Sequence, residues 1–168
     1  EKTAVSLEKS VNEVKYVAAI VRYDVIDNDA AVADAIMDAS KDKVAFAMET
    51  AEGPAEIYEM DRNGKQVKKL TNLNGDAVKG KYVAKPNAID YVSEGWKLRG
   101  WVLLPKDYDP KKKYPAVLDV HGGPRGIYSP IFVHEMQVWA SKGYFVYFGN
   151  IVGSDGRDDE FADLRGKY

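Results

Sequence analysis

The residues best suited to chemistry lie in one glycine-rich loop. His121-Gly122-Gly123-Pro124 follows directly on the apolar run Ala116–Val120. Two adjacent glycines remove the side chains that would keep a substrate away from the backbone, and they allow positive φ angles. Backbone N–H groups exposed in this way can stabilise a negatively charged oxygen. Taken alone, the tetrapeptide fits two interpretations equally: an oxyanion-stabilising loop, or a tight strand-to-helix turn without a chemical role.

A nucleophile that would work with such a loop is not found in the sequence. A Ser-His-Asp hydrolase built on an α/β sheet needs G-x-S-x-G at the serine, followed by the acid and then the histidine. None of the seven serines meets this pattern. Ser154 has Gly156 after it but Val152 before it, and Ser93 also lacks the first glycine. His121 is excluded as the base, because it lies too early in the chain order of this fold.

Metal binding is not indicated either. His134 begins a stretch like the zinc motif H-E-x-x-H, but the second histidine position is Val138. The acidic run 27–38, treated as a calcium loop, would have Val32 where glycine is needed and Asp38 where glutamate is needed. The chain has no cysteine, which excludes disulfides and thiolate ligands. We expect neither a metal nor another cofactor.

The composition is that of a globular domain, with 45% of the 168 residues hydrophobic and 30% charged. The formal net charge is -2, so we expect no nucleic-acid partner and no attraction to an anionic membrane. No apolar run approaches the length of a membrane span. Because the chain begins with Glu1 rather than methionine, the lack of a visible leader says little about the compartment, and the cytoplasm is only a default.

The elements before about Lys85 are expected to be strands. The run 43–50 alternates with the two-residue period of a strand, and Asn63-Gly64 is a strong hairpin signal. Strand, turn, strand, hairpin and strand within about 40 residues is the spacing of a propeller blade or a sandwich sheet. The stretch Val14–Val25 could be a strand pair or a helix, and we favour strands.

The elements after Asn87 predict a different architecture. Two strands should flank the turn Ser93-Glu94-Gly95, and Ala116–Val120 is expected to be a buried parallel strand with helices on both faces. Beyond the glycine loop, Ser129 would cap a helix that starts at Pro130 and ends near Gly143. The run 144–150 then forms a second buried strand. Strand, glycine loop, helix and strand make a βαβ unit of an α/β sheet.

Taken in order, these segments resemble the prolyl oligopeptidase family of serine peptidases, particularly its acylaminoacyl-peptidase-like and dipeptidyl-peptidase-like branches. The resemblance covers residues 36–168 and includes "GPAEIYEMD", "KKLTNLN", "WKLRGWVLLPKDYDPKKKYPAVLDVHGGP" and "FVHEMQVWASKGYFVYFGNIVGSDGRDDEFADLRGKY". The chain departs from the family in one place. Where the family commonly has Asn-Pro-Arg-Gly-Ser, this chain has Asn150-Ile151-Val152-Gly153-Ser154, so no role of that arginine is carried over.

The resemblance implies an α/β hydrolase fold, present only in its N-terminal part and preceded by all-β propeller blades. Residues 1–85 would end the propeller, with the last blade and part of the preceding one. Residues 86–168 would begin the peptidase domain and stop before the nucleophile, so that the triad is expected beyond Tyr168. The parent reaction would be serine-type hydrolysis of short peptides, and this chain alone is expected to be inactive.

The resemblance also assigns the glycine loop. Gly123 would supply an oxyanion-hole N–H, Gly122 and Pro124 would shape the loop, and His121 would be structural. Two other functions stay open: an esterase-like α/β-hydrolase, since glycine loops also serve ester substrates, and a non-catalytic binding module with a hydrolase-like fold.

An incomplete doubly wound sheet should also leave its last strand as an open apolar edge. We therefore expect an oligomer, or the remainder of the same protein, to cover that edge. Without such cover the chain should be unstable or aggregated.

Overall fold

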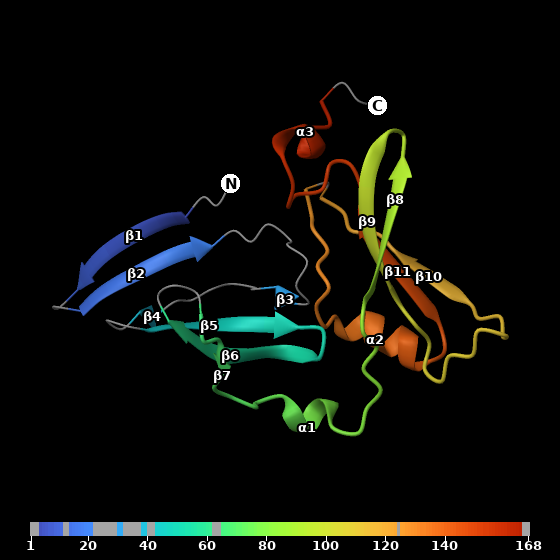
Figure 1. Cartoon of the computed structure of the whole chain (residues 1–168), viewed down its shortest axis with the longest axis horizontal. Helices are drawn as coiled ribbons and strands as arrows, with labels where there is room; N and C mark the ends of the chain where they lie inside the picture. Colours follow the sequence, from blue (N-terminus) through green and yellow to red (C-terminus); the bar gives the residue numbers. More distant parts are fainter. Residues whose placement is uncertain are drawn as a thin grey trace.

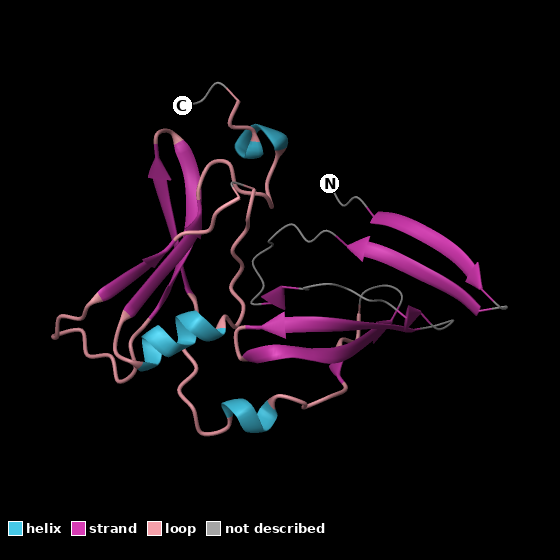
Figure 2. Ribbon diagram, turned by 180° about the vertical axis from the view of Figure 1, so that it is seen from behind, coloured by secondary structure: helices cyan, strands magenta, loops and turns pink. Residues whose placement is uncertain are grey.

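The computed structural model describes residues 4–11, 14–21, 30–31, 38–39, 43–61, 65–123 and 125–165. Their backbone forms three sheets and three short helices. One sheet has five strands and another, which is mixed, has four; the second helix lies between them in Figures 1 and 2. Among the described residues, no helix has the length and apolar character needed to cross a membrane.

The N-terminal part is β-structure in two sheets (Figure 1). An antiparallel pair consists of β1 (Ala4–Val11) and β2 (Val14–Val21). The larger sheet has the order β3-β5-β6-β7, with β4 also paired to β5. Its strands are β3 (Ala30–Ala31), β4 (Asp38–Ala39), β5 (Lys43–Thr50), β6 (Gly53–Asp61) and β7 (Lys68–Lys69). Strands over 14–21 and 43–50 are thus confirmed, whereas residues 22–25 and the predicted turn at Asn63-Gly64 lie outside the described residues.

The two-residue period of β5 predicts that one side of the strand is buried. Phe46 is buried, and it pairs across the sheet with Tyr58 of β6. The two rings stack with their centroids 6.1 Å apart, a cross-strand aromatic pair that stabilises antiparallel sheets. The helix α1 (Gly75–Val78) then leads from this sheet to the next.

The mixed sheet contains the predicted βαβ unit. Its order is β10-β11-β9-β8, formed by β8 (Asn87–Ser93), β9 (Trp96–Leu103), β10 (Ala116–Asp119) and β11 (Phe145–Asn150). β10 and β11 are parallel and are connected through α2 (His134–Ser141), whereas the other pairs are antiparallel. Both central residues of the β8–β9 turn have positive φ, 50° at Glu94 and 81° at Gly95, as a type I′ hairpin requires. A short helix, α3 (Asp159–Ala162), follows β11.

The core of this part lies between α2 and one face of the mixed sheet. Met136 and Ala140 of α2 are buried against Val146 of β11. Beside them, the rings of Trp101 and Phe148 stack at 5.6 Å. Strands β9 and β11 therefore have one face buried by the helix.

One face of β10 is exposed, although we predicted that helices would cover both faces. Ala116 and Leu118 are exposed, and Leu118 keeps 66% of its surface accessible.

The expected position of the open edge is also wrong. The last strand, β11, lies between β10 and β9, and the edge strands of this sheet, among those described, are β10 and β8. The crossover connection through α2 inserts the later strand between two earlier ones, an order that local sequence signals do not contain.

The start of α2 is a second correction. The helix begins at His134 rather than Pro130, and Ser129 does not cap it. The N–H of Phe132 instead donates to the carbonyl of Thr50 in β5, at 2.8 Å. This bond to the neighbouring sheet holds the preceding segment out of the helix. The predicted end is confirmed, because Gly143 follows the helix with φ +93°.

Candidate functional site

The glycine loop lies at the carboxyl end of β10, the edge at which open α/β sheets bind ligands. Gly122 and Gly123 are both exposed. Gly123 has φ +124°, and a Cβ atom there would lie 3.3 Å from the backbone nitrogens of Arg125 and Gly126. Its conformation and its close contacts both favour glycine. Pro124, the fourth residue of the predicted loop, lies outside the described residues.

The backbone N–H groups of this loop are available to donate hydrogen bonds. Among the described residues, no acceptor is hydrogen-bonded to the N–H of Gly122 or Gly123. Gly122 also has free space around it, since an added Cβ would meet nothing within 4 Å. The loop can therefore offer backbone N–H groups to an oxygen that approaches from solvent.

His121 is fixed by contacts on several sides. Its Nε2 lies 2.8 Å from the Ser154 hydroxyl oxygen, and its Nδ1 lies 3.2 Å from the Gly122 carbonyl oxygen. The ring of Tyr128 meets the imidazole edge-on, with the centroids 5.1 Å apart. A neutral imidazole that donates from Nδ1 to Gly122 would accept the Ser154 proton at Nε2. These contacts hold the imidazole in place beside the glycine loop.

Tyr128, which packs against His121, is itself held by hydrogen bonds. Its hydroxyl donates to the Asp119 carboxylate at the end of β10. The Asn150 side chain forms two hydrogen bonds with the backbone of Tyr128. It accepts from the N–H at 2.7 Å and donates to the carbonyl at 2.9 Å. Burial, together with the Asp119 carboxylate, raises the pKa of Tyr128 above its ordinary value. The phenol therefore stays protonated and remains a donor.

The segment after β11 makes several contacts with the glycine loop and the residues that follow it. Ser154 is fully buried, and the N–H of Asp155 donates to the Gly126 carbonyl at 3.1 Å. The Asp155 carboxylate also accepts from Arg125 at 3.0 Å. Further along, the Asp158 side chain caps α3 by accepting from the Phe161 N–H at 2.8 Å. Sequence reasoning missed these roles because the partners of Ser154 and Asp155 lie about 30 positions away.

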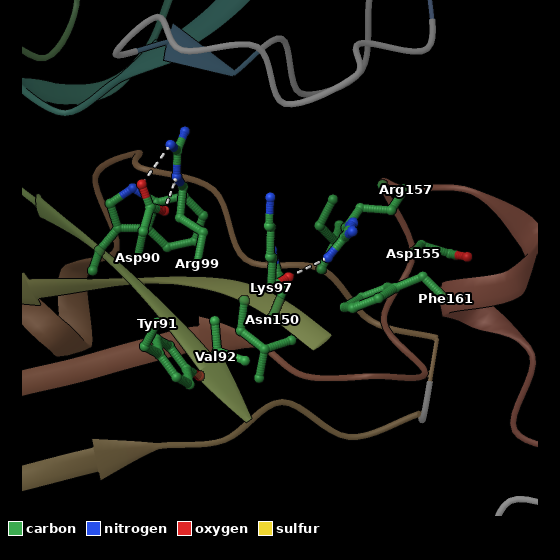
Figure 3. Close-up of a pocket in the computed structure, with 13 residues that line it drawn as sticks. Asp90, Tyr91, Val92, Lys97, Arg99, Asn150, Asp155, Arg157 and Phe161 are labelled. Atoms are coloured by element: carbon green, nitrogen blue, oxygen red, sulfur yellow. Dashed lines mark hydrogen bonds and ion pairs between the residues drawn. The ribbon is translucent and has the colours of Figure 1, made fainter. Parts of the chain in front are cut away.

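A cavity of about 550 Å³ opens between the β8–β9 hairpin, Ile127 and the segment after β11 (Figure 3). Its apolar lining includes Leu98, Trp101 and Phe161, all buried. Its polar lining includes Lys97 and Arg157. Arg157 donates from Nη1 to the Lys97 carbonyl at 2.6 Å, and its guanidinium carbon lies 4.1 Å from the centre of the Phe161 ring.

The residues considered as metal ligands are not brought together. His134 is exposed at the start of α2, and the described parts of the chain contain no group of three or more side chains that could hold a metal ion. The acidic run 27–38 lies almost entirely outside the described residues.

Comparison with known proteins identifies peptidases as relatives. No family model matches the chain. It is 37% identical over 117 residues to the uncharacterized peptidase YuxL of Bacillus subtilis, a match that covers 68% of this chain and 18% of that protein. It is also 34% identical over 68 residues to dipeptidyl-peptidase 5 of Aspergillus fumigatus, covering 39% of this chain and 9% of that protein.

Solved structures agree with these relatives. An acylaminoacyl peptidase in complex with Z-Gly-Gly-Phe-chloromethyl ketone superposes with a TM-score of 0.75 at 29% identity, covering 98% of this chain and 27% of that one. The acylaminoacyl peptidase of Pyrococcus horikoshii gives 0.73 at 30% identity, covering 96% of this chain and 25% of that one. A puromycin hydrolase at 15% identity and TM-score 0.65 shares the fold alone. The chain thus spans about a quarter or less of the length of the relatives that it matches.

Proposed function

Because this chain belongs to the prolyl oligopeptidase family of serine peptidases, we propose that it supplies the oxyanion-stabilising loop of an enzyme that hydrolyses short peptides. Gly123 carries this proposal. Its N–H is open, its backbone adopts φ +124° in a position suited to glycine, and it follows a parallel strand at the ligand-binding edge. Gly122 and Pro124 shape the loop, and His121 anchors it to Ser154.

The reaction is acyl transfer. The oxygen of a serine outside this chain attacks the scissile carbonyl while a histidine base takes its proton. The carbonyl oxygen becomes an oxyanion that accepts a hydrogen bond from Gly123 N–H and from a second donor outside the chain. The C–N bond then breaks, the amine leaves with the proton, and water hydrolyses the acyl-enzyme to regenerate the serine.

The two parts of the chain have separate roles in this proposal. Residues 1–85 form the end of a β-propeller that limits access to short peptides, and residues 86–168 begin the α/β-hydrolase domain. The antiparallel sheet of β3–β7 supports the assignment of a blade, and the unit β10–α2–β11 supports that of the hydrolase sheet. We place the serine, acid and histidine of the triad in residues that follow Tyr168 in the parent protein.

Two other functions are compatible with the same loop. An esterase would use Gly123 in the same way, but the blade-like sheet before the hydrolase part favours a peptidase. A non-catalytic binding module would keep the loop without a nucleophile. Sequence that continues this chain separates them: G-x-S-x-G followed by an acid and a histidine indicates an enzyme, and its replacement indicates a binding role.

The test is labelling of the parent protein with a fluorophosphonate probe, followed by intact mass measurement. We expect one adduct on a species heavier than 18.7 kDa and none on the 168-residue chain. Gly123→Ala keeps the N–H but disfavours φ +124°, so it should displace this donor and slow hydrolysis of a peptide p-nitroanilide by up to about 100- to 1,000-fold. Gly143→Ala is the control, because it imposes a similar backbone strain at φ +93° behind α2. Absence of an adduct on the parent protein, or equal activity of the two variants, would overturn the proposal.

A further inference from the structure

We propose that the cavity between the β8–β9 hairpin and the segment after β11 binds a carboxylate attached to an apolar or aromatic body. This inference rests on the proposed peptidase function, and it places an acidic peptide end or an acidic side chain of the substrate between Lys97 and Arg157. The cavity of about 550 Å³ lies within the size range of small-ligand sites. Figure 3 shows both residues on the lining, with Arg157 beside Phe161.

Arg157 is oriented before any ligand arrives. One of its terminal nitrogens, Nη1, donates to the Lys97 carbonyl at 2.6 Å, and the guanidinium lies over the Phe161 ring at 4.1 Å. Phe161 itself is fully buried and packs edge-on against Trp96. A planar guanidinium fixed in this way keeps further N–H groups available and loses little freedom on binding, which suits it to carboxylate recognition.

The charge balance of the cavity favours an anion. Two acidic groups on its lining are already paired: Asp90 with Arg99 at 2.7 Å, and Asp155 with Arg125 at 3.0 Å. Among the described residues, neither Lys97 nor Arg157 forms an ion pair. The Lys97 backbone carbonyl accepts from Arg157, and both residues line the cavity. Two positive charges on one lining raise the local concentration of anionic groups.

The apolar lining of the cavity favours an anion that carries an apolar group. Val92 and Ile127 contribute accessible apolar surface to the lining, with exposed fractions of 68% and 42%. An inorganic anion would leave this surface wet, whereas a peptide with an aromatic or aliphatic side chain would cover it. The lining therefore fits a small peptide with a carboxylate better than a free inorganic anion.

The cavity is also coupled to the proposed oxyanion loop. Asp155 lines the cavity, and its N–H donates to Gly126 while its carboxylate pairs with Arg125. Ile127, next to Gly126, lines the cavity too. Asp155 and Ile127 thus connect the lining of the cavity to the residues that follow the glycine loop.

The experiment measures binding without turnover, on the parent protein that carries this chain. Three probes are compared by calorimetry: acetyl-Ala-Phe with a free carboxylate, its C-terminal amide, and acetyl-Glu-Phe amide, which has only a side-chain carboxylate. We expect the neutral amide to bind at least about tenfold more weakly than the free acid. Lys97→Gln and Arg157→Gln should each weaken the free acid by about tenfold and leave the neutral amide unchanged.

Lys111→Gln is the matched control, because it removes the same charge from an exposed position on the connector before β10. Lys97 is exposed as well, so Lys97→Gln keeps the test valid even if Arg157→Gln disturbs Phe161. Preference for acetyl-Glu-Phe amide over the neutral amide would identify a side-chain carboxylate as the ligand, and preference for the free acid alone would identify the peptide terminus.

Equal affinity for the charged and neutral probes, or equal effects of Lys97→Gln and Lys111→Gln, would overturn the carboxylate site. Fluorophosphonate labelling of the same samples separates this result from failure of the peptidase proposal. Labelling without charge-dependent binding rejects the site and keeps the enzyme. Charge-dependent binding without labelling rejects the peptidase and keeps the site as a binding pocket.

Discussion

The imidazole Nε2 of His121 lies 2.8 Å from the hydroxyl oxygen of Ser154, although 33 positions separate the two residues. This contact joins the loop after β10 to the segment after β11. Because Ser154 is fully buried, its hydroxyl has no access to solvent if the bond is lost. The position of the glycine loop therefore depends on a residue that belongs to a different connection.

Ser154→Ala should loosen the glycine loop. Removal of the hydroxyl leaves His121 Nε2 without its partner, at an expected cost of about 1–3 kcal/mol in the free energy of unfolding. Denaturant titration measures the cost, and the ¹⁵N shift of the imidazole reports the loss of the bond directly. Ser141→Ala is the control, because Ser141 is an exposed residue at the end of α2. An unchanged imidazole spectrum in Ser154→Ala would show that the bond is not formed in solution.

Gly100→Ala should destabilise the mixed sheet. A Cβ atom at this position would lie 2.5 Å from the Tyr147 hydroxyl oxygen and 2.8 Å from its ring, so the ring must move and lose its 2.9 Å hydrogen bond to Tyr91. We expect a loss of about 1–3 kcal/mol, measured by denaturant titration. Gly122→Ala should cost much less, since its Cβ meets nothing within 4 Å. The double variant with Tyr147→Leu should recover part of the loss, and strict additivity would contradict this explanation.

The Glu56 carboxylate should make stability depend on pH in the acid range. It accepts a hydrogen bond from Thr71 and from the backbone N–H groups of Leu73 and Asn74, at 2.9 and 2.8 Å. These bonds, with Thr71 the largest cause, lower the pKa of Glu56 from 4.5 to about 2. A lowered folded-state pKa means that its contribution is complete above pH 4.5 and is lost as the pH falls toward about 2.

Glu56→Gln should therefore flatten the acid limb of the stability curve between these pH values. The measurement is chemical unfolding at a series of pH values. Glu52→Gln is the control, because Glu52 is exposed and makes only a surface ion pair with Lys85 at 3.4 Å. If both variants retain the slope of the unmodified protein, the carboxylate at Glu56 is not its source.

The exposed edge at β10 should cause association of the 168-residue chain. Leu118 presents 66% of its surface on a strand that has no further neighbour among the described residues. We propose that a second copy, or the remainder of the parent protein, covers this edge. Leu118→Lys should reduce self-association, because a charge on an edge strand opposes strand addition. Light scattering coupled to gel filtration measures it, and a stable monomer of the unmodified chain would contradict the prediction.

Local sequence patterns determined the elements of this protein. The alternation in 43–50, the two-residue turn Glu94-Gly95 and the stop at Gly143 each act through φ angles or side-chain periods within a few residues. The strand–loop–helix–strand order likewise specified a parallel βαβ unit, and the glycine pair marked the loop. These features were predictable because the physical constraints on them are local.

Tertiary contacts decided how those elements are assembled. The start of α2 depends on Thr50, which lies in another sheet. The interior position of β11 follows from the crossover rather than from its own residues. Ser154 and Arg157 acquire their roles only when His121 and Lys97 are brought to them. Hydrogen bonds and ion pairs across such separations depend on the packed geometry of the whole sheet, which no local pattern in the chain encodes.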